Sequence, residues 1–163
     1  MSVENTVLED QSVKRKPLIG RCDHRLDPKW RCTVPLQWFE RMGHPREVYV
    51  MRSLTREPCL EVFAAADFDE RLAPFRSRAL SDARMAAFLR ELSEATELLT
   101  VDSQNRIRVP DAMLAYAGLE SDIVLYGSDY HFEMWSLSRR PKLLGNDPSR
   151  IDSLAAESKD LNF

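Results

Sequence analysis

A ten-residue pattern occurs twice in this chain, 75 positions apart, and it constrains the fold more than any other feature. Residues 26–35 and residues 101–110 each predict a short strand, a turn that holds charge at its tip, and a second strand that ends at a proline. A helix is expected after each proline. Repetition of this kind predicts two similar units. The shared positions are Asp27, Arg31, Val34 and Pro35 in the first copy, and Asp102, Arg106, Val109 and Pro110 in the second.

Length and composition fit an ordinary globular protein. The 163 residues suffice for one domain with a core or for two small fused units, and 44% of them are hydrophobic. No apolar run approaches the roughly 20 residues of a membrane span, and none follows the basic residues 14–16, so we expect neither a membrane helix nor a secretory signal. The three cysteines lack disulfide-like spacing, which favours a reducing cytoplasm.

The formal net charge of −3 does not by itself indicate a nucleic-acid partner. Between Lys14 and Arg56, however, basic residues outnumber acidic ones, and acidic residues gather at 91–97 and in the C-terminal tail. A chain with a negative net charge can therefore still carry a locally basic surface.

Each copy of the pattern continues into a similar set of elements. The first predicts strands at 21–27 and 31–34, a helix at 36–42 that ends at Gly43, and strands at 48–51 and 60–63. The second predicts a helix at 111–117 that ends at Gly118, and strands at 123–126 and 132–135 separated by a turn at 127–129. Gly118 lies 75 positions after Gly43, so the two helix ends repeat in register.

The remaining segments link or flank the two repeats. Residues 64–99 are interpreted as helical, with a short helix at 67–72 before Pro74 and a second helix capped by Ser81 or Asp82. The expected organisation is a disordered extension at 1–17, a first repeat at 18–66, linking helices at 67–99, a second repeat at 100–140, and a flexible tail at 141–163 with one helical turn near 151–156.

The repeated pattern resembles the MraZ family of bacterial transcriptional regulators, which are built from two AbrB-like (SpoVT–AbrB type) swapped-hairpin domains. The resemblance covers residues 18–140 and is carried by segments 18–20, 24–31, 34–35, 101–110, 116–119 and 132–135. It implies an α+β fold of two pseudo-symmetric swapped-hairpin β units with short helices and a linking helical segment. It also implies a cytoplasmic, nucleoid-associated regulator of division and cell-wall genes. Such a regulator would act as a ring-shaped homo-oligomer on repeated boxes in double-stranded promoter DNA, without a membrane partner.

In that family the Asp-x-x-x-Arg loops form the DNA-facing surface. An arginine at a loop tip presents a planar fork for phosphate or guanine, and an aspartate four residues earlier can orient it or fix the turn. Lysine adds a flexible charge suited to phosphate. The predicted DNA-binding residues are Lys29, Arg31, Arg106 and Arg108, and the predicted loop-orienting residues are Asp27 and Asp102.

Both loops depart from the family pattern at the position before the arginine, where glycine is usual and Trp30 and Asn105 stand here. Glycine at a turn tip usually indicates φ > 0, a conformation that asparagine tolerates and tryptophan adopts poorly. We therefore expect the second loop to keep the family shape, and the first either to be re-formed or to stack its indole on a neighbour. Whether Trp30 stacks or packs between subunits is left open.

Other interpretations remain open at this point. Arg31 and Arg106 could merely form ion pairs with their aspartates, and a protein-interaction module of the same fold could have lost DNA binding. No metal site is expected, because the cysteines and His24 lack paired close spacing. No cofactor and no enzymatic activity are expected either, because the chain has no Gly-rich phosphate loop and no His-Glu metal motif.

Overall fold

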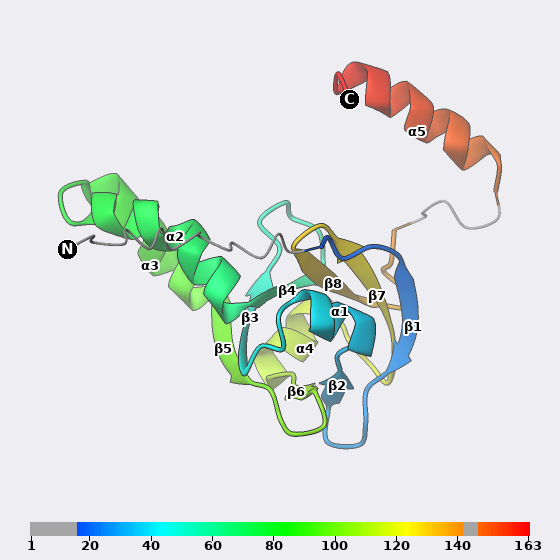
Figure 1. Cartoon of the computed structure of the whole chain (residues 1–163), viewed down its shortest axis with the longest axis horizontal. Coiled ribbons are helices and arrows are strands. Elements are labelled where there is room, and N and C mark those ends of the chain that lie inside the picture. Colours follow the sequence, from blue (N-terminus) through cyan, green and yellow to red (C-terminus); the bar gives the residue numbers. More distant parts are fainter. Residues whose placement is uncertain (1–15, 142–146) are drawn as a thin grey trace, which may run out of the picture.

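Two matching sets of elements build the molecule, shown as a computed structural model that describes residues 16–141 and 147–163 (Figure 1). The first set is β1 (Arg21–Arg25), β2 (Arg31–Thr33), α1 (Leu36–Arg41), β3 (Glu47–Arg52) and β4 (Leu60–Ala64). The second set is β5 (Thr96–Thr100), β6 (Arg106–Arg108), α4 (Asp111–Ala117), β7 (Asp122–Ser128) and β8 (His131–Ser136). The predicted repetition is therefore present in the secondary structure, with a short helix at the same place in each set.

The two repeats are interleaved in one antiparallel sheet with the strand order β1-β7-β8-β4-β3-β5. Strand β1 of the first repeat pairs with β7 of the second, and β5 of the second pairs with β3 of the first. Strands β4 and β8 pair with each other at the centre, where Glu61 lies opposite Glu133. Each repeat thus supplies the edge strand of the other, which confirms the α+β fold with swapped hairpins.

A two-stranded ribbon of β2 and β6 lies apart from this sheet, and the main core fills the space between them (Figure 1). Alternation along the ribbon points Cys32 and Ile107 inward, where both are fully buried. Helix α1 contributes Trp38, whose ring lies 5.6 Å from that of Phe132 and whose Nε1 donates a hydrogen bond of 3.1 Å to the Ile19 carbonyl. Cys32, Ile107 and Trp38 therefore belong to the main core.

The segment between the repeats differs from the prediction. Helix α2 (Ala65–Ala79) runs through Pro74, and α3 (Ala83–Glu94) follows it as an antiparallel partner. Residues 96–100 form strand β5, not helix, because their backbone pairs with β3. Pro74 is tolerated because it is exposed, so the carbonyl that loses its donor can be hydrated. The predicted cap is present: the Asp82 carboxylate accepts hydrogen bonds from the Arg84 and Met85 amides.

Four further details bear on the predictions. Gly43 and Gly118 both have positive φ, as expected for helix ends. Gly127 is not a turn residue: it lies inside β7, where a Cβ atom would come within 2.6 Å of the Ile19 backbone nitrogen. In the tail, α5 (Ser149–Asp160) has three turns where one was predicted, and none of its residues is buried. None of the described helices has the length and apolar character to cross a membrane.

The predicted extension at 1–17 lies largely outside the described residues, as does part of the tail. The boundaries between repeats, linker and tails therefore stay a prediction, with one structural observation to set beside it. Strand β5 lies 75 positions after β1 and occupies the equivalent place at the other edge of the sheet. On that ground we propose that the second repeat begins at residue 96, four residues before the predicted boundary.

Candidate nucleic-acid interface

The first loop, residues 27–31, is held closed by the side chain of Asp27. One carboxylate oxygen, Oδ1, accepts hydrogen bonds of 2.9 Å from the backbone amides of Lys29 and Arg31. The other oxygen, Oδ2, accepts a hydrogen bond of 2.6 Å from Nε of Arg31. Two backbone hydrogen bonds complete the turn: the Asp27 amide donates to the Arg31 carbonyl, and the Trp30 amide donates to the Asp27 carbonyl.

The second loop, residues 102–106, repeats this arrangement bond for bond. Oδ1 of Asp102 accepts from the amides of Gln104 and Arg106 at 2.8 and 2.9 Å, and Oδ2 accepts from Nε of Arg106 at 2.8 Å. The same pair of backbone hydrogen bonds joins residue 102 to residues 105 and 106. The loop-orienting role predicted for the two aspartates therefore matches the geometry of both loops.

The two tip positions have the same left-handed backbone, with φ of 60° at Trp30 and 59° at Asn105. The expectation that tryptophan would either re-form the first loop or stack on a neighbour is wrong in its first alternative. The physical reason is that the aspartate hydrogen bonds and the ribbon fix the backbone from both sides, which outweighs the roughly 1–2 kcal/mol cost of a left-handed conformation. The indole remains 39% exposed beside a hollow of about 710 Å³ lined partly by Arg25 and Ser121.

Antiparallel pairing of β2 with β6 joins the two loops through one short ribbon, with one loop at each end. Arg31 lies opposite Arg108, and Thr33 lies opposite Arg106, so these four side chains share the outward face of the ribbon. Two hydrogen bonds join each loop tip to the end of the opposite strand: the Val34 amide donates to the Asn105 carbonyl, and the Val109 amide donates to the Trp30 carbonyl. We call the outward side chains of Arg31, Arg106 and Arg108 the arginine face.

The arginine face is partly engaged within the protein. The side chains of Arg31 and Arg106 are 27% and 24% exposed, because Nε of each is bound to its aspartate. Among the described residues, no hydrogen bond of their terminal Nη groups is found, so these groups remain as donors. Arg108 is more exposed, and its guanidinium reaches Asp111 at 3.3 Å. Lys29 is exposed at the tip of the first loop.

The two aspartates stay ionised under ordinary conditions. Desolvation acts to raise the pKa of Asp27, but the hydrogen bonds from Arg31 and Lys29 and the positive charge of Arg31 outweigh it and lower the pKa below its ordinary value. The pKa of Asp102 is lowered in the same way, with Arg106 and Gln104 as the donors. Each loop therefore presents a guanidinium whose direction is set by a charged carboxylate.

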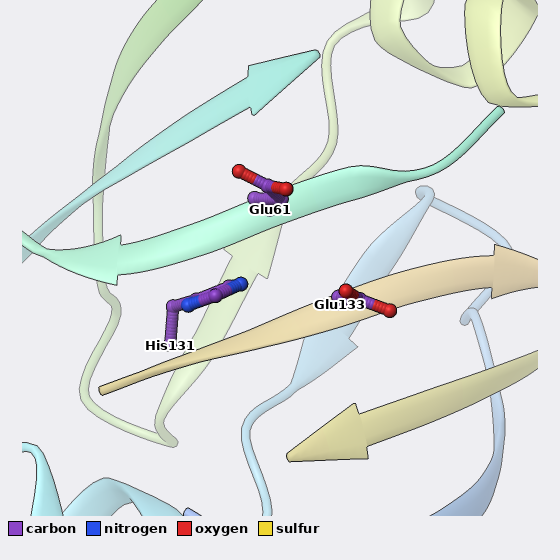
Figure 2. A group of neighbouring side chains, drawn as sticks. All are labelled: Glu61, His131 and Glu133. Carbon is purple, nitrogen blue, oxygen red and sulfur yellow. The ribbon is translucent and has the colours of Figure 1, made fainter. Parts of the chain in front are cut away.

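The structure therefore brings together all the predicted site residues: Lys29, Arg31, Arg106 and Arg108, with Asp27 and Asp102 behind them. The period-two alternation of β2 points Thr33 outward beside Arg31, but Thr33 was not among the predicted site residues, and it shares the outward face of the ribbon. Sequence reasoning also missed a group of potential metal-binding side chains, Glu61, His131 and Glu133, on the central strands of the sheet (Figure 2).

Residues 92–162 match the family model described as "MraZ protein, putative antitoxin-like". The chain is 27% identical over 136 residues to the transcriptional regulator MraZ of Acetivibrio thermocellus, which covers 83% of this chain and 92% of that protein. It is 29% identical over 121 residues to that of Symbiobacterium thermophilum, with coverage of 74% and 85%. The relative from Thermoanaerobacter sp. is 25% identical and is covered over 99% of its length.

Proposed function

We propose that this chain is a transcriptional regulator of the MraZ family that binds double-stranded DNA through the arginine face, because residues 92–162 match the MraZ family model and MraZ regulators are similar to it over most of its length. The observation that carries the proposal is the pairing of β2 with β6. This pairing sets the two hydrogen-bonded Asp-x-x-x-Arg loops at the two ends of one ribbon and puts both arginines on its outward face, in a chain whose net charge is negative.

The chemistry of this surface suits the phosphate backbone and the base edges of DNA. A guanidinium held through Nε keeps its two Nη groups in a plane, which favours bidentate contact with phosphate or with guanine O6 and N7. Lys29 adds a mobile charge beside the first loop. In this proposal Arg31 and Arg106 make the positioned contacts, and Lys29 and Arg108 contribute sequence-independent phosphate contacts.

One protomer offers only these few positive charges, so useful affinity requires several protomers on one DNA. Each neutralised phosphate contributes about −0.9 to the slope of log K against log salt, and linked sites gain affinity through effective concentration. We therefore propose that protomers assemble into a ring that presents several arginine faces to repeated boxes in promoters of division and cell-wall genes. The site of action would be the cytoplasm, at the nucleoid.

The decisive experiment compares Arg106→Ala with Arg90→Ala, a matched removal of one exposed guanidinium on α3, away from the ribbon. Binding to the DNA upstream of the protein's own gene is measured by fluorescence anisotropy across a salt series. We expect Arg106→Ala to weaken binding by about tenfold or more and to flatten the salt slope, while the assembly state is unchanged. Equal affinity of both variants and the wild type at low salt would contradict the proposal.

The same experiment separates DNA contact from a purely internal ion pair. If Arg106 served only Asp102, Arg106→Ala would lower the melting temperature and leave DNA affinity unchanged. If Arg106 contacts DNA, the affinity of Arg106→Ala for DNA falls even under conditions where the variant is fully folded.

A second candidate function is a protein-interaction module of this fold, and the observation that favours it is the exposed indole of Trp30 at the tip of the first loop. Aromatic side chains are enriched in protein interfaces, and the net charge of the chain is negative. This candidate predicts no DNA binding even at low salt, together with a protein partner whose capture is abolished in Trp30→Ala.

A further inference from the structure

Two glutamates face each other at the centre of the sheet, on the side away from the main core. Glu61 of β4 lies directly opposite Glu133 of β8, and both side chains are half-buried. Like charges directly opposite in an antiparallel pair are destabilising, and partial burial strengthens their repulsion. This placement therefore calls for a compensating positive charge close to both carboxylates.

A histidine completes the group. His131 is two residues before Glu133 on β8, so its side chain lies on the same face of the sheet. Figure 2 shows the imidazole extended toward the two carboxylates. One ligand atom from each of the three residues lies within 4.8 Å of the others. We call Glu61, His131 and Glu133 the carboxylate–histidine cluster.

The imidazole points a buried nitrogen into this group. Nε2 of His131 is inaccessible to solvent and has no hydrogen-bond partner among the described residues. The ring is stacked on Phe63, with centroids 4.6 Å apart and planes at 21°, so its orientation is fixed by packing. Buried polar nitrogens are rarely left without a hydrogen-bond partner. An unpartnered imidazole nitrogen beside two carboxylates therefore points to a cation as the missing partner.

Neighbouring side chains hold the two carboxylates in a way typical of metal sites. Ser53 Oγ donates to Oε1 of Glu61 at 3.1 Å, and Nε1 of Trp135 donates to Oε2 of Glu133 at 2.8 Å. Each carboxylate therefore has one oxygen anchored and one left for a ligand. Such outer hydrogen bonds orient the groups that bind a metal.

The nearby guanidinium of Arg71 does not supply the compensating positive charge at close range. The guanidinium of Arg71 lies over the Phe63 ring, 5.7 Å from its centre, on the exposed surface of α2. Among the described residues, no hydrogen bond joins it to either carboxylate. Its charge acts on Glu61 and His131 only at longer range.

We infer that the carboxylate–histidine cluster is a binding site for a divalent transition-metal ion of the zinc type, which joins β4 of the first repeat to β8 of the second. Imidazole nitrogen and carboxylate oxygen are both ligands of zinc, at about 2.0–2.2 Å. Three such ligand atoms around one ion lie roughly 3–4 Å apart. Side-chain rotations that move these atoms by about 1 Å would therefore bring them to coordination distance. Solvent would complete the coordination, because the three residues are only half-buried.

The pseudo-symmetry of the fold explains why the site has one histidine and not two. Glu133 lies 72 positions after Glu61, and His131 lies 72 positions after Cys59, so the cysteine occupies the place equivalent to the histidine. Counting along paired strands puts Cys59 about four residues, or roughly 13 Å, from the level of His131. Cys59 therefore cannot bind the same ion as His131.

The test is zinc binding by the full chain, measured by calorimetry or by competition with a chromophoric chelator. We expect one saturable ion per chain, and Glu61→Gln and His131→Gln should each weaken binding at least about tenfold. His24→Gln and Glu97→Gln are the matched controls, because these residues lie on the edge strands β1 and β5 and should leave binding unchanged. Absence of saturable binding, or equal affinity in all variants, would overturn the inference.

A measurement on the wild-type protein guards against variants that fail to fold. With Co²⁺ in place of zinc, the His131 ring resonances should shift or broaden selectively, and no thiolate-to-cobalt charge-transfer band should appear. Unperturbed His131 resonances would overturn the inference, and so would an intense thiolate band, since it would assign the ion to a cysteine. Because none of these residues belongs to the arginine face, loss of zinc binding leaves the proposed DNA binding testable on its own.

Discussion

The first and second loops have the same backbone although all three residues between aspartate and arginine differ. The first loop reads Pro28-Lys29-Trp30 where the second reads Ser103-Gln104-Asn105. The hydrogen bonds nevertheless correspond one to one, and the tip φ values are 60° and 59°. The comparison teaches that the flanking Asp and Arg, with the ribbon beneath them, determine the loop geometry. The intervening residues are then free to set charge and surface chemistry.

The difference between the loops lies in what they present. The first carries an exposed lysine and a 39% exposed indole, whereas the second carries neutral amides. If the arginine face binds DNA, the first loop supplies the larger positive charge and an apolar surface, and the second supplies hydrogen-bonding side chains. The two loops should therefore respond alike to changes in the backbone and differently to changes in surface chemistry.

The largest effect is expected from removing the aspartates. Asp27→Ala or Asp102→Ala takes away the oxygen that accepts two amide hydrogen bonds and the partner of the guanidinium, so the loop loses its closed shape. DNA affinity should fall at least about tenfold in each case, similarly for the two loops, and the melting temperature should fall as well. Asp67→Ala on α2 is a control carboxylate outside the ribbon. A reduction confined to one loop would break the proposed equivalence.

A smaller effect should reveal the left-handed position in each loop. Replacement of Trp30 by alanine or by glycine removes the same indole, so the difference between the two variants isolates the backbone. The free energy of unfolding of the glycine variant should exceed that of the alanine variant by about 1 kcal/mol, because φ at residue 30 is positive. The corresponding pair at Asn105 should give the same difference. Urea unfolding measures both, and a difference present only at residue 105 would mean that the first loop has another conformation in solution.

The smallest effect is a pH dependence of stability. The folded pKa of Asp27 and of Asp102 is below the ordinary value of 3.8, so each carboxylate stabilises the fold above that value, and the stabilisation disappears as the pH falls through the folded pKa. Stability at neutral pH is unaffected by this titration. Urea midpoints of wild type and of Asp102→Asn should therefore converge as the pH is lowered below about 4. A constant gap between them would contradict the assignment.

Much of the fold could be predicted because its signals are local. These signals are the prolines, the two glycines at helix ends and the alternation along the strands, and each depends on only a few neighbouring residues. Most of them occur in both repeats, so each repeat supports the interpretation of the other. Strand β5 was missed although the repeat offers a signal for it 75 positions after β1, because residues 96–100 continue a helical stretch and become a strand by pairing with β3, about fifty positions earlier. The extent of α2 was missed for a related reason: packing against α3 and the sheet carries the helix past Pro74.

The candidate site divides in the same way. The aspartates and arginines were predictable because the repeat marks them, although their DNA role stays a prediction. The left-handed backbone of Trp30 was not predictable, because the φ preference of tryptophan takes no account of the hydrogen bonds that fix this loop. The carboxylate–histidine cluster was invisible to spacing rules, because Glu61 and His131 meet only through the pairing of β4 with β8.

The exchange of edge strands between the repeats has a consequence for how the arginines are delivered. Two copies of a swapped-hairpin unit on separate chains would meet only above some concentration, and the distance between their tips would depend on that encounter. Here one continuous polypeptide contains both repeats. The distance between the arginines of the ribbon is therefore the same at any protein concentration.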